Sequence, residues 1–255
     1  MKRSRFAAAL LIAAAMLQCS GRDTMSVPSI AAAGEVDPGS CRQQPLSGLP
    51  LVERSATGNS DNLVIFLSGD GGWRRIDQRI SDGLNAAGLP VVGFLSNVYF
   101  SNPRSPAETA CDMEALIDHS LRALGKKRVL LVGYSRGADA LPLIVNRLSP
   151  ATRARVSRIG LLNPAVTAQL HSHHWWQMHE IQVQNYELIP EMLRLTGVGV
   201  TCIYGSEEEE SLCSRLPAGS ATVIRLHGGH HFGGAYSEIA RLLVAALAGD
   251  SHSDL

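Results

Sequence analysis

Continuous runs of apolar residues, each ending in glycine or a small polar residue, recur along most of the chain. Such runs are typical of strands that are buried on both faces of a parallel sheet. The predicted strands are 62–69, 89–96, 127–135, 156–164, 198–205 and 221–228. Between them the apolar positions follow helical spacing and are closed by glycine or proline signals. The predicted helices are 76–88, 105–124, 137–148 and 235–249.

This alternation predicts an α/β fold, with a mostly parallel, doubly wound sheet and helices on both faces. Sites in such sheets form at the carboxyl ends of the strands. Residues 165–197 interrupt the alternation, and we expect a small cap over the site there. The expected division is a signal peptide over 1–21, a flexible leader over 22–45 and one domain over 46–250.

The beginning of the chain has a different pattern. Three basic side chains lie within the first five residues, and an apolar run from Phe6 to Leu17 follows. The run is too short to span a bilayer and is typical of a secretory signal peptide, so we expect a periplasmic protein. Cleavage near Gly21, cleavage after Ala33 and a lipid anchor on Cys19 stay open as alternatives.

Four further cysteines agree with export, because disulfides persist in oxidising compartments. Four cysteines permit three pairings. Cys202 and Cys213 bracket a short acidic loop, so we favour the pairs Cys202–Cys213 and Cys41–Cys111. The second pair would tie the leader to the domain.

The charge of the chain is balanced. Its 255 residues include 23 basic and 23 acidic side chains. The length suits one large α/β domain. A balanced charge gives no electrostatic attraction toward nucleic acid, so no nucleic-acid partner is expected.

The strongest chemical signal is the pentapeptide Gly-Tyr-Ser-Arg-Gly at 133–137. It lies between a predicted strand and a predicted helix, which is the setting that a G-x-S-x-G nucleophile elbow requires. The small flanking residues permit a tight turn that projects the serine above the sheet. There the helix N-terminus favours developing negative charge. We therefore predict that Ser135 is a nucleophile.

A serine nucleophile needs a base and an acid that orients the base. In the α/β-hydrolase order the acid follows the serine and the histidine comes last. The run Glu207–Glu210 follows a strand, and its spacing favours Glu208, with the other glutamates left open. His230 and His231 follow the last strand. We choose His231 as the base and His230 as a substrate contact.

The glycine-rich turn at 68–73 follows the first buried strand, where an oxyanion hole is expected. We predict that the backbone N–H groups of Asp70 (or Gly71) and Arg136 hold the oxyanion. Other predicted substrate contacts are side chains near the serine or in the cap. They are Gly71, Trp73, Tyr134, Asp139, Trp175 and Trp176.

The cap segment also contains four histidines, which raises metal binding as an alternative. They are His171, His173, His174 and His179. No cysteine or carboxylate accompanies them at familiar ligand spacing, so neither a metal nor a cofactor is expected.

Four segments together resemble the VirJ/AcvB family: LSGDGGW, GYSRGADALP, CIYGSEEEESLC and GGHHFGGAY. The resemblance runs from about residue 45 to 250 and fits the single-domain VirJ-like form. It implies a periplasmic serine hydrolase of the α/β-hydrolase fold. It places the serine at Ser135, the histidine in the His230–His231 pair and the acid in the 207–210 run. Longer members are associated with hydrolysis of the lysyl ester of lysyl-phosphatidylglycerol, and VirJ itself with type IV secretion.

The predicted function is therefore hydrolysis of an aminoacyl-phospholipid ester, with Asp70, Asp139 or a spare glutamate recognising the lysyl cation. A non-catalytic envelope-binding module on the same fold and a general carboxylesterase are the alternatives. The expected partners are a lipid or small ester substrate and the membrane surface. Envelope proteins would be the partners of a binding module.

Overall fold

The computed structural model describes residues 41, 46–54, 58–171 and 184–250. The predicted signal peptide lies outside the described residues, and so do Trp175 and Trp176 of the predicted cap. In the described part of the chain, no helix is both long and apolar enough to cross a membrane.

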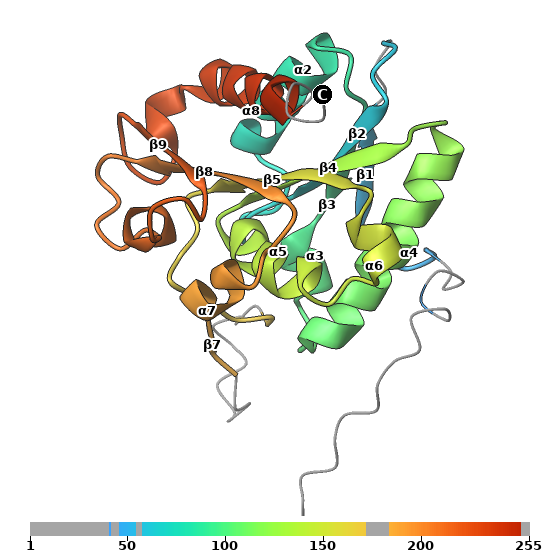
Figure 1. The fold of residues 1–255 in the computed structure, drawn as a ribbon, viewed down its shortest axis with the longest axis horizontal. Coiled ribbons are helices and arrows are strands. Elements are labelled where there is room, and N and C mark those ends of the chain that lie inside the picture. Colours follow the sequence, from blue (N-terminus) through green and yellow to red (C-terminus); the bar gives the residue numbers. More distant parts are fainter. Residues whose placement is uncertain (1–40, 42–45, 55–57, 172–183, 251–255) are drawn as a thin grey trace, which may run out of the picture. The chain divides into compact units, whose positions relative to one another are not determined.

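A seven-stranded sheet forms the centre of the domain, in the order β1-β3-β2-β4-β5-β8-β9 (Figure 1). The strands are β1 (Leu51–Arg54), β2 (Asn62–Leu67), β3 (Val91–Phe94), β4 (Arg128–Tyr134), β5 (Val156–Leu162), β8 (Gly199–Gly205) and β9 (Thr222–Leu226). All neighbours are parallel except β1, which pairs antiparallel with β3. The six predicted strands are confirmed, and β1 is an additional edge strand.

Helices cover both faces of the sheet. Figure 1 shows α2 (Arg75–Ala86) and α8 (Tyr236–Asp250) on one face, with α4 (Pro106–Ala123) and α5 (Arg136–Val145) on the other. The four predicted helices are therefore confirmed. Two unpredicted single turns, α3 (Ser96–Tyr99) and α6 (Pro150–Arg153), lie on the same side as α4 and α5. This arrangement is the α/β-hydrolase fold.

Strand β2 shows why the apolar runs are continuous. Leu63, Ile65 and Leu67 lie in the core that contains α4 and α5. Val64 and Phe66 lie in the second core, under α2 and α8. Neighbouring side chains of a strand point to opposite faces, so both sets must be apolar. Each fully buried aliphatic or aromatic side chain stabilises the fold by about 1.5–3 kcal/mol.

The predicted cap is partly described. A two-stranded antiparallel sheet of β6 (Thr167–Ala168) and β7 (Tyr186–Glu187) leads into α7 (Leu188–Leu193), which packs against α5. Residues 172–183, which connect β6 to β7, are outside the described residues.

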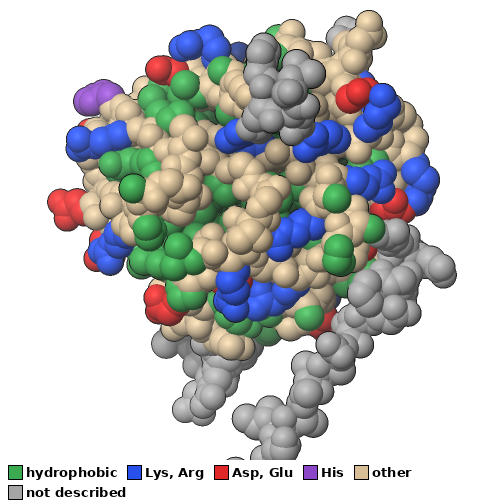
Figure 2. Space-filling view, in the orientation of Figure 1, with side chains coloured by type: hydrophobic (Ala, Val, Ile, Leu, Met, Phe, Trp, Pro, Cys, Tyr) green, Lys and Arg blue, Asp and Glu red, His purple; other side chains and the backbone are tan. Residues whose placement is uncertain are grey.

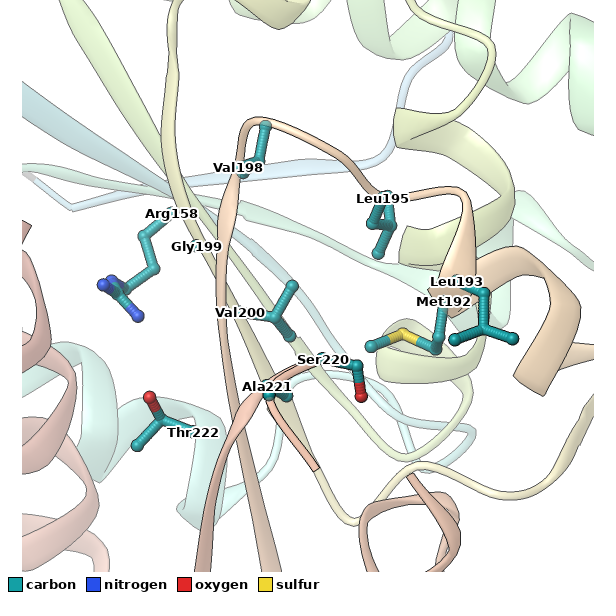
Figure 3. A pocket seen from close by; sticks show the side chains of 11 residues that line it. Arg158, Met192, Leu193, Leu195, Val198, Gly199, Val200, Ser220, Ala221 and Thr222 are labelled. Atoms are coloured by element: carbon teal, nitrogen blue, oxygen red, sulfur yellow. The ribbon is translucent and has the colours of Figure 1, made fainter. Parts of the chain in front are cut away.

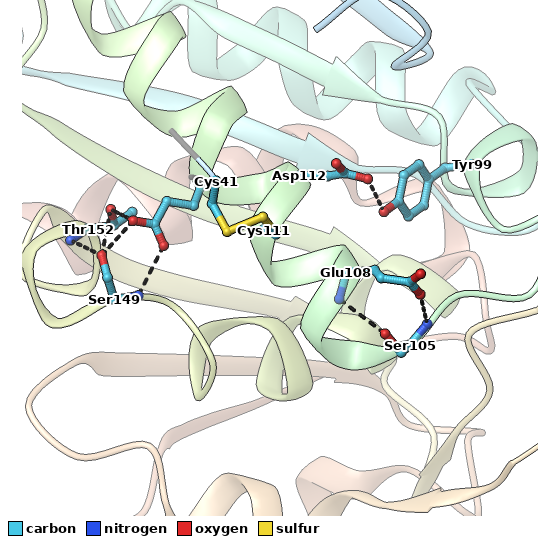
Figure 4. The surroundings of a disulfide bond; sticks show 9 residues. Cys41, Tyr99, Ser105, Glu108, Cys111, Asp112, Ser149 and Thr152 are labelled. Carbon is cyan, nitrogen blue, oxygen red and sulfur yellow. Dashed lines mark hydrogen bonds between the residues drawn. A yellow bond between two sulfur atoms is a disulfide. The ribbon is translucent and has the colours of Figure 1, made fainter. Parts of the chain in front are cut away.

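Both predicted disulfides are present. Cys41 is bonded to Cys111 on α4 (Figure 4). Cys202 on β8 is bonded to Cys213. The same figure shows how α4 begins: Ser105 Oγ accepts from the Glu108 amide, while the Glu108 carboxylate accepts from the Ser105 amide. This reciprocal capping box matches the predicted helix start. Two disulfides in one domain fit an oxidising, exported environment.

Charged side chains of both signs lie on the surface. Figure 2 shows Lys and Arg side chains across one face of the molecule, with Asp and Glu side chains mostly near its rim.

Candidate active site

Ser135 occupies the sharp turn between β4 and α5. Its backbone has φ 52° and ψ −122°, a conformation that is rare for a residue with a side chain. A Cβ added at Gly133 would overlap with the backbone of Gly137, and one added at Gly137 would overlap with the Leu67 carbonyl. Both glycines are therefore required by close backbone packing. The strained turn projects the Ser135 hydroxyl at the carboxyl end of β4, as a nucleophile elbow does.

His230 is the imidazole that faces the serine. Its Nε2 lies 3.0 Å from Ser135 Oγ, within hydrogen-bond distance. Its Nδ1 lies 3.5 Å from Glu208 Oε1, so the carboxylate is at ion-pair distance behind the ring. The structure thus brings together a hydroxyl, a base and an orienting acid in the order that a triad needs. Glu208, the favoured member of the glutamate run, takes the acid position.

His231, the predicted base, contacts Tyr134, and the ring that contacts Ser135 is that of His230. His231 Nδ1 lies 2.9 Å from the Tyr134 hydroxyl, and its ring therefore does not face Ser135. The turn bends sharply at this point, with Phe232 and Gly233 both at positive φ. The two adjacent histidines therefore point to different partners. His230, predicted as a substrate contact, is the histidine within hydrogen-bond distance of Ser135.

Asn163, which the sequence analysis missed, joins the two loops that carry His230 and Glu208. Its Nδ2 donates to the His230 carbonyl at 2.8 Å, and its Oδ1 accepts from the Gly205 amide at 2.8 Å. Gly205 ends β8, directly before the glutamate run. Asn163 is buried and adopts φ 49°, a left-handed conformation that asparagine tolerates better than most residues. The Asn-Pro pair that ends the predicted strand 156–164 is the sequence signal that could have pointed to it.

Tyr134 provides a second support for the histidine turn. Its hydroxyl lies 3.2 Å from the His230 carbonyl oxygen, in addition to its contact with His231. Burial raises the pKa of the Tyr134 phenol, and the nearby Asp77 carboxylate raises it further. The phenol is therefore neutral and can donate. Tyr134 was predicted as a substrate contact, and the structure shows it holding the histidine turn.

The turn after β2 lies beside the serine, where the oxyanion hole is expected. A Cβ added at Gly69 would lie 3.3 Å from Ser135 Cβ. Among the described residues, the backbone amides of Asp70, Gly71 and Arg136 have no hydrogen-bond acceptor. Amides in this position can donate to an oxygen of a bound substrate. The assignment of these amides to an oxyanion hole stays a prediction, and their position beside Ser135 is compatible with it.

The side chains of Asp70 and Arg136 bind each other. Arg136 Nη2 lies 2.9 Å from Asp70 Oδ2, and Nε also contacts the carboxylate. Arg136 Nη1 donates to the carbonyls of Gln169 and His171 at 2.7 and 3.0 Å. Arg136 therefore ties the predicted oxyanion turn to the first residues of the predicted cap. Asp70, one of the carboxylates expected to recognise a substrate cation, is thus already paired with Arg136.

Asp139 lies one turn after the serine on α5. Its Oδ1 accepts from the Ala165 amide at 2.7 Å. Burial raises the pKa of this carboxyl to about 7, although the Ala165 amide and the Arg136 charge act in the opposite direction. Asp139 thus holds the chain where it enters the predicted cap.

Two other predicted substrate contacts have structural partners instead. Trp73 packs edge-on against Phe66, with ring centroids 5.7 Å apart, and lies against Gly93. It belongs to the second core. The Gly71 carbonyl accepts from Arg74 Nε at 2.6 Å.

The described residues contain no group of His, Cys, Asp or Glu that could hold a metal ion. Of the four cap histidines, only His171 is described, and it is buried.

A cavity of about 410 Å³ lies at the amino ends of β8 and β9, lined by Arg158, Met192 and Val200 among others (Figure 3). Ser135 follows the carboxyl end of β4. This cavity therefore lies at the opposite ends of the strands from the candidate site.

Comparisons with known proteins agree with this arrangement. A family model described as bacterial virulence protein (VirJ) matches residues 61–250. No curated protein matches the sequence.

Solved structures of the same fold share little sequence with this chain. Est1E from Butyrivibrio proteoclasticus, solved with ferulic acid, has 10% identity and a TM-score of 0.53, over 80% of this chain and 96% of its own. Proline iminopeptidase from Mycobacterium smegmatis has 11% identity and a TM-score of 0.56, over 83% and 98%. A thioesterase domain from the curacin biosynthetic pathway has 16% identity and a TM-score of 0.52, over 76% and 94%. At these identities the similarity shows the α/β-hydrolase fold alone.

Proposed function

The chain belongs to the bacterial virulence protein VirJ family, and we propose that it is an exported serine hydrolase that cleaves an ester. The observation that carries the proposal is the 3.0 Å separation between His230 Nε2 and Ser135 Oγ at a strained elbow. A non-catalytic module would not need to maintain a backbone conformation that is costly for serine. Two disulfides support export.

In the proposed reaction, Ser135 Oγ attacks the ester carbonyl carbon while His230 Nε2 takes the hydroxyl proton. Glu208 stabilises the imidazolium that forms. The N–H groups of Asp70 (or Gly71) and Arg136 donate to the oxyanion. His230 then gives the proton to the leaving alkoxide, which departs as an alcohol. Water, deprotonated by His230, attacks the acyl-enzyme and releases the carboxylic acid and the free serine.

We propose an aminoacyl-phospholipid, lysyl-phosphatidylglycerol, as the substrate. The family resemblance implies this substrate class, and an exported enzyme would meet such lipids at the membrane surface. The lysyl ammonium needs carboxylates near the site that are not already paired. With Asp70 neutralised by Arg136, Glu207 is the favoured candidate, because its carboxylate lies beside Gly229 in the histidine turn.

The test uses the purified protein with its disulfides intact, next to Ser135→Ala and the control Ser101→Ala. Each is incubated with lysyl-phosphatidylglycerol in detergent micelles and, separately, with a short-chain aryl ester. We expect free lysine from the native protein and Ser101→Ala, and none from Ser135→Ala. Serine-dependent turnover of the aryl ester alone would support a general carboxylesterase. No serine-dependent turnover of either substrate would favour a binding module.

A further inference from the structure

A second cavity, of about 420 Å³, lies between α2 and the start of α8. Two arginines of α2 line one part of it, and the turn that leads into α8 lines the rest. The lining residues are Arg75, Arg79, Gly233, Gly234, Tyr236 and Ser237. Figure 1 shows α2 and α8 on the same face of the sheet, in agreement with their extensive contacts.

The two arginines bring positive charge that is not compensated. Arg75 and Arg79 are one turn apart on α2, and both are exposed. Neither forms an ion pair with any described residue. The carboxylates of α2 are engaged elsewhere: Asp77 Oδ2 accepts from the Arg74 amide, and Asp82 pairs with Arg54. On α8, Glu238 lies 3.9 Å from Arg241.

This charge arrangement is unfavourable for the helix itself. Like charges one turn apart repel, and basic residues near a helix N-terminus oppose the helix dipole. Arg75 is the first residue of α2, and Asp77 is the acidic residue of its first turn. The charges of the two arginines therefore do not stabilise α2. A bound anion would reverse both effects.

We propose that this cavity binds the phosphate group of a ligand through Arg75 and Arg79. Guanidinium groups bind phosphate oxygens with pairs of parallel hydrogen bonds. Two such groups can bind separate oxygens, and the hydroxyls of Tyr236 and Ser237 add neutral donors along the wall. The cavity is larger than a phosphate ion needs, so there is room for an organic group attached to the phosphate.

The cavity shares its wall with the turn that carries the proposed base. Gly233 and Gly234 follow His230 by three and four residues, and the Gly234 amide donates to the His231 carbonyl at 3.1 Å. A phosphate held here would lie against the flank of the histidine turn. Its source is the headgroup of a phospholipid substrate, which rests on the proposed function, or a free phosphate ester.

Binding is tested first without any enzymatic readout. Isothermal titration calorimetry with inorganic phosphate, against sodium chloride of equal ionic strength, compares the native protein with Arg75→Gln/Arg79→Gln. Loss of the charged hydrogen bonds should weaken binding about tenfold or more. Arg215→Gln is the matched control, because Arg215 is exposed and outside the cavity. No binding to the native protein, or equal binding to the double variant, would overturn the proposal.

Kinetics then distinguish the two sources of phosphate. If the headgroup is the ligand, the double variant raises KM for lysyl-phosphatidylglycerol about tenfold and leaves turnover of the phosphate-free aryl ester unchanged. An unchanged lipid KM together with lost phosphate binding supports a free phosphate ester as the ligand and overturns the headgroup assignment. If the native protein hydrolyses neither ester but still binds phosphate through these arginines, the proposed function fails and the phosphate site stands.

Discussion

Replacing Asn163 tests whether one buried amide holds the acid loop and the histidine turn together. Asn163→Ala removes two hydrogen bonds of 2.8 Å, one to the His230 carbonyl and one from the Gly205 amide. The His230 carbonyl keeps the Tyr134 hydroxyl at 3.2 Å. The buried Gly205 amide is left without its acceptor. Loss of the hydrogen bond to Gly205 should therefore cost more than loss of the one to His230.

The magnitude follows from these contacts. Each lost hydrogen bond costs about 1 kcal/mol, and the orphaned buried amide adds about 1 kcal/mol or more. Alanine at φ 49° adds about 1 kcal/mol of backbone strain. We expect the free energy of unfolding of Asn163→Ala to fall by about 3–4 kcal/mol. Asn163→Gly, which accepts this φ, should lose about 1 kcal/mol less.

The assays are urea unfolding with the disulfides intact and steady-state turnover of an aryl ester at a temperature where each variant is folded. A displaced His230 should lower kcat by about 10–100-fold with little change in KM, because displacements near 1 Å have effects of that size. Tyr134→Phe, which removes the other donor to the same carbonyl, should have a smaller effect. If Asn163→Ala keeps native kcat and loses less than about 0.5 kcal/mol of stability, Asn163 does not hold the two loops.

Three further outcomes are expected. Glu208→Gln should lower kcat on an aryl ester at least about 100-fold while Glu207→Gln changes it little; equal effects would contradict the choice of acid. Gly137→Ala should abolish soluble expression or lower the thermal midpoint strongly, because its Cβ would overlap with the Leu67 carbonyl; a native-like midpoint would show that the elbow can relax. The folded-state pKa of Asp139, about 7, exceeds its ordinary value of 3.8, so the folded protein binds the proton more tightly. Its contribution to stability should therefore fall as the pH rises from 3.8 to about 7, and Asp139→Asn should remove this part of the pH dependence of urea unfolding.

The architecture was predictable because burial on both faces leaves a clear pattern. The run in β2 has no polar interruption between Leu63 and Leu67, since both core layers need its side chains. The tight turn at Gly133 and Gly137 could likewise be predicted, because only glycine fits where two backbone segments pack this closely. The additional strand β1 has a mixed burial pattern, and its pairing with β3 depends on distant residues.

The orientation of side chains in turns was not predictable. His230 and His231 have identical chemistry and adjacent positions, and only the folded turn shows which of them faces Ser135. The role of Asn163 depends on three loops that meet only in the folded chain. The order of residues at the end of one strand does not show which other loops will lie beside it.

The central claim is that His230 activates Ser135, and covalent labelling tests it without knowledge of the substrate. The native protein, His230→Ala and His231→Ala are each treated with a fluorophosphonate, and the labelling rate at Ser135 is followed by intact mass and peptide mapping. We predict labelling of the native protein and of His231→Ala at rates within about tenfold, and labelling of His230→Ala slower by about 10³-fold or more. Slow labelling of His231→Ala with native-like labelling of His230→Ala would contradict the assignment of His230 as the base.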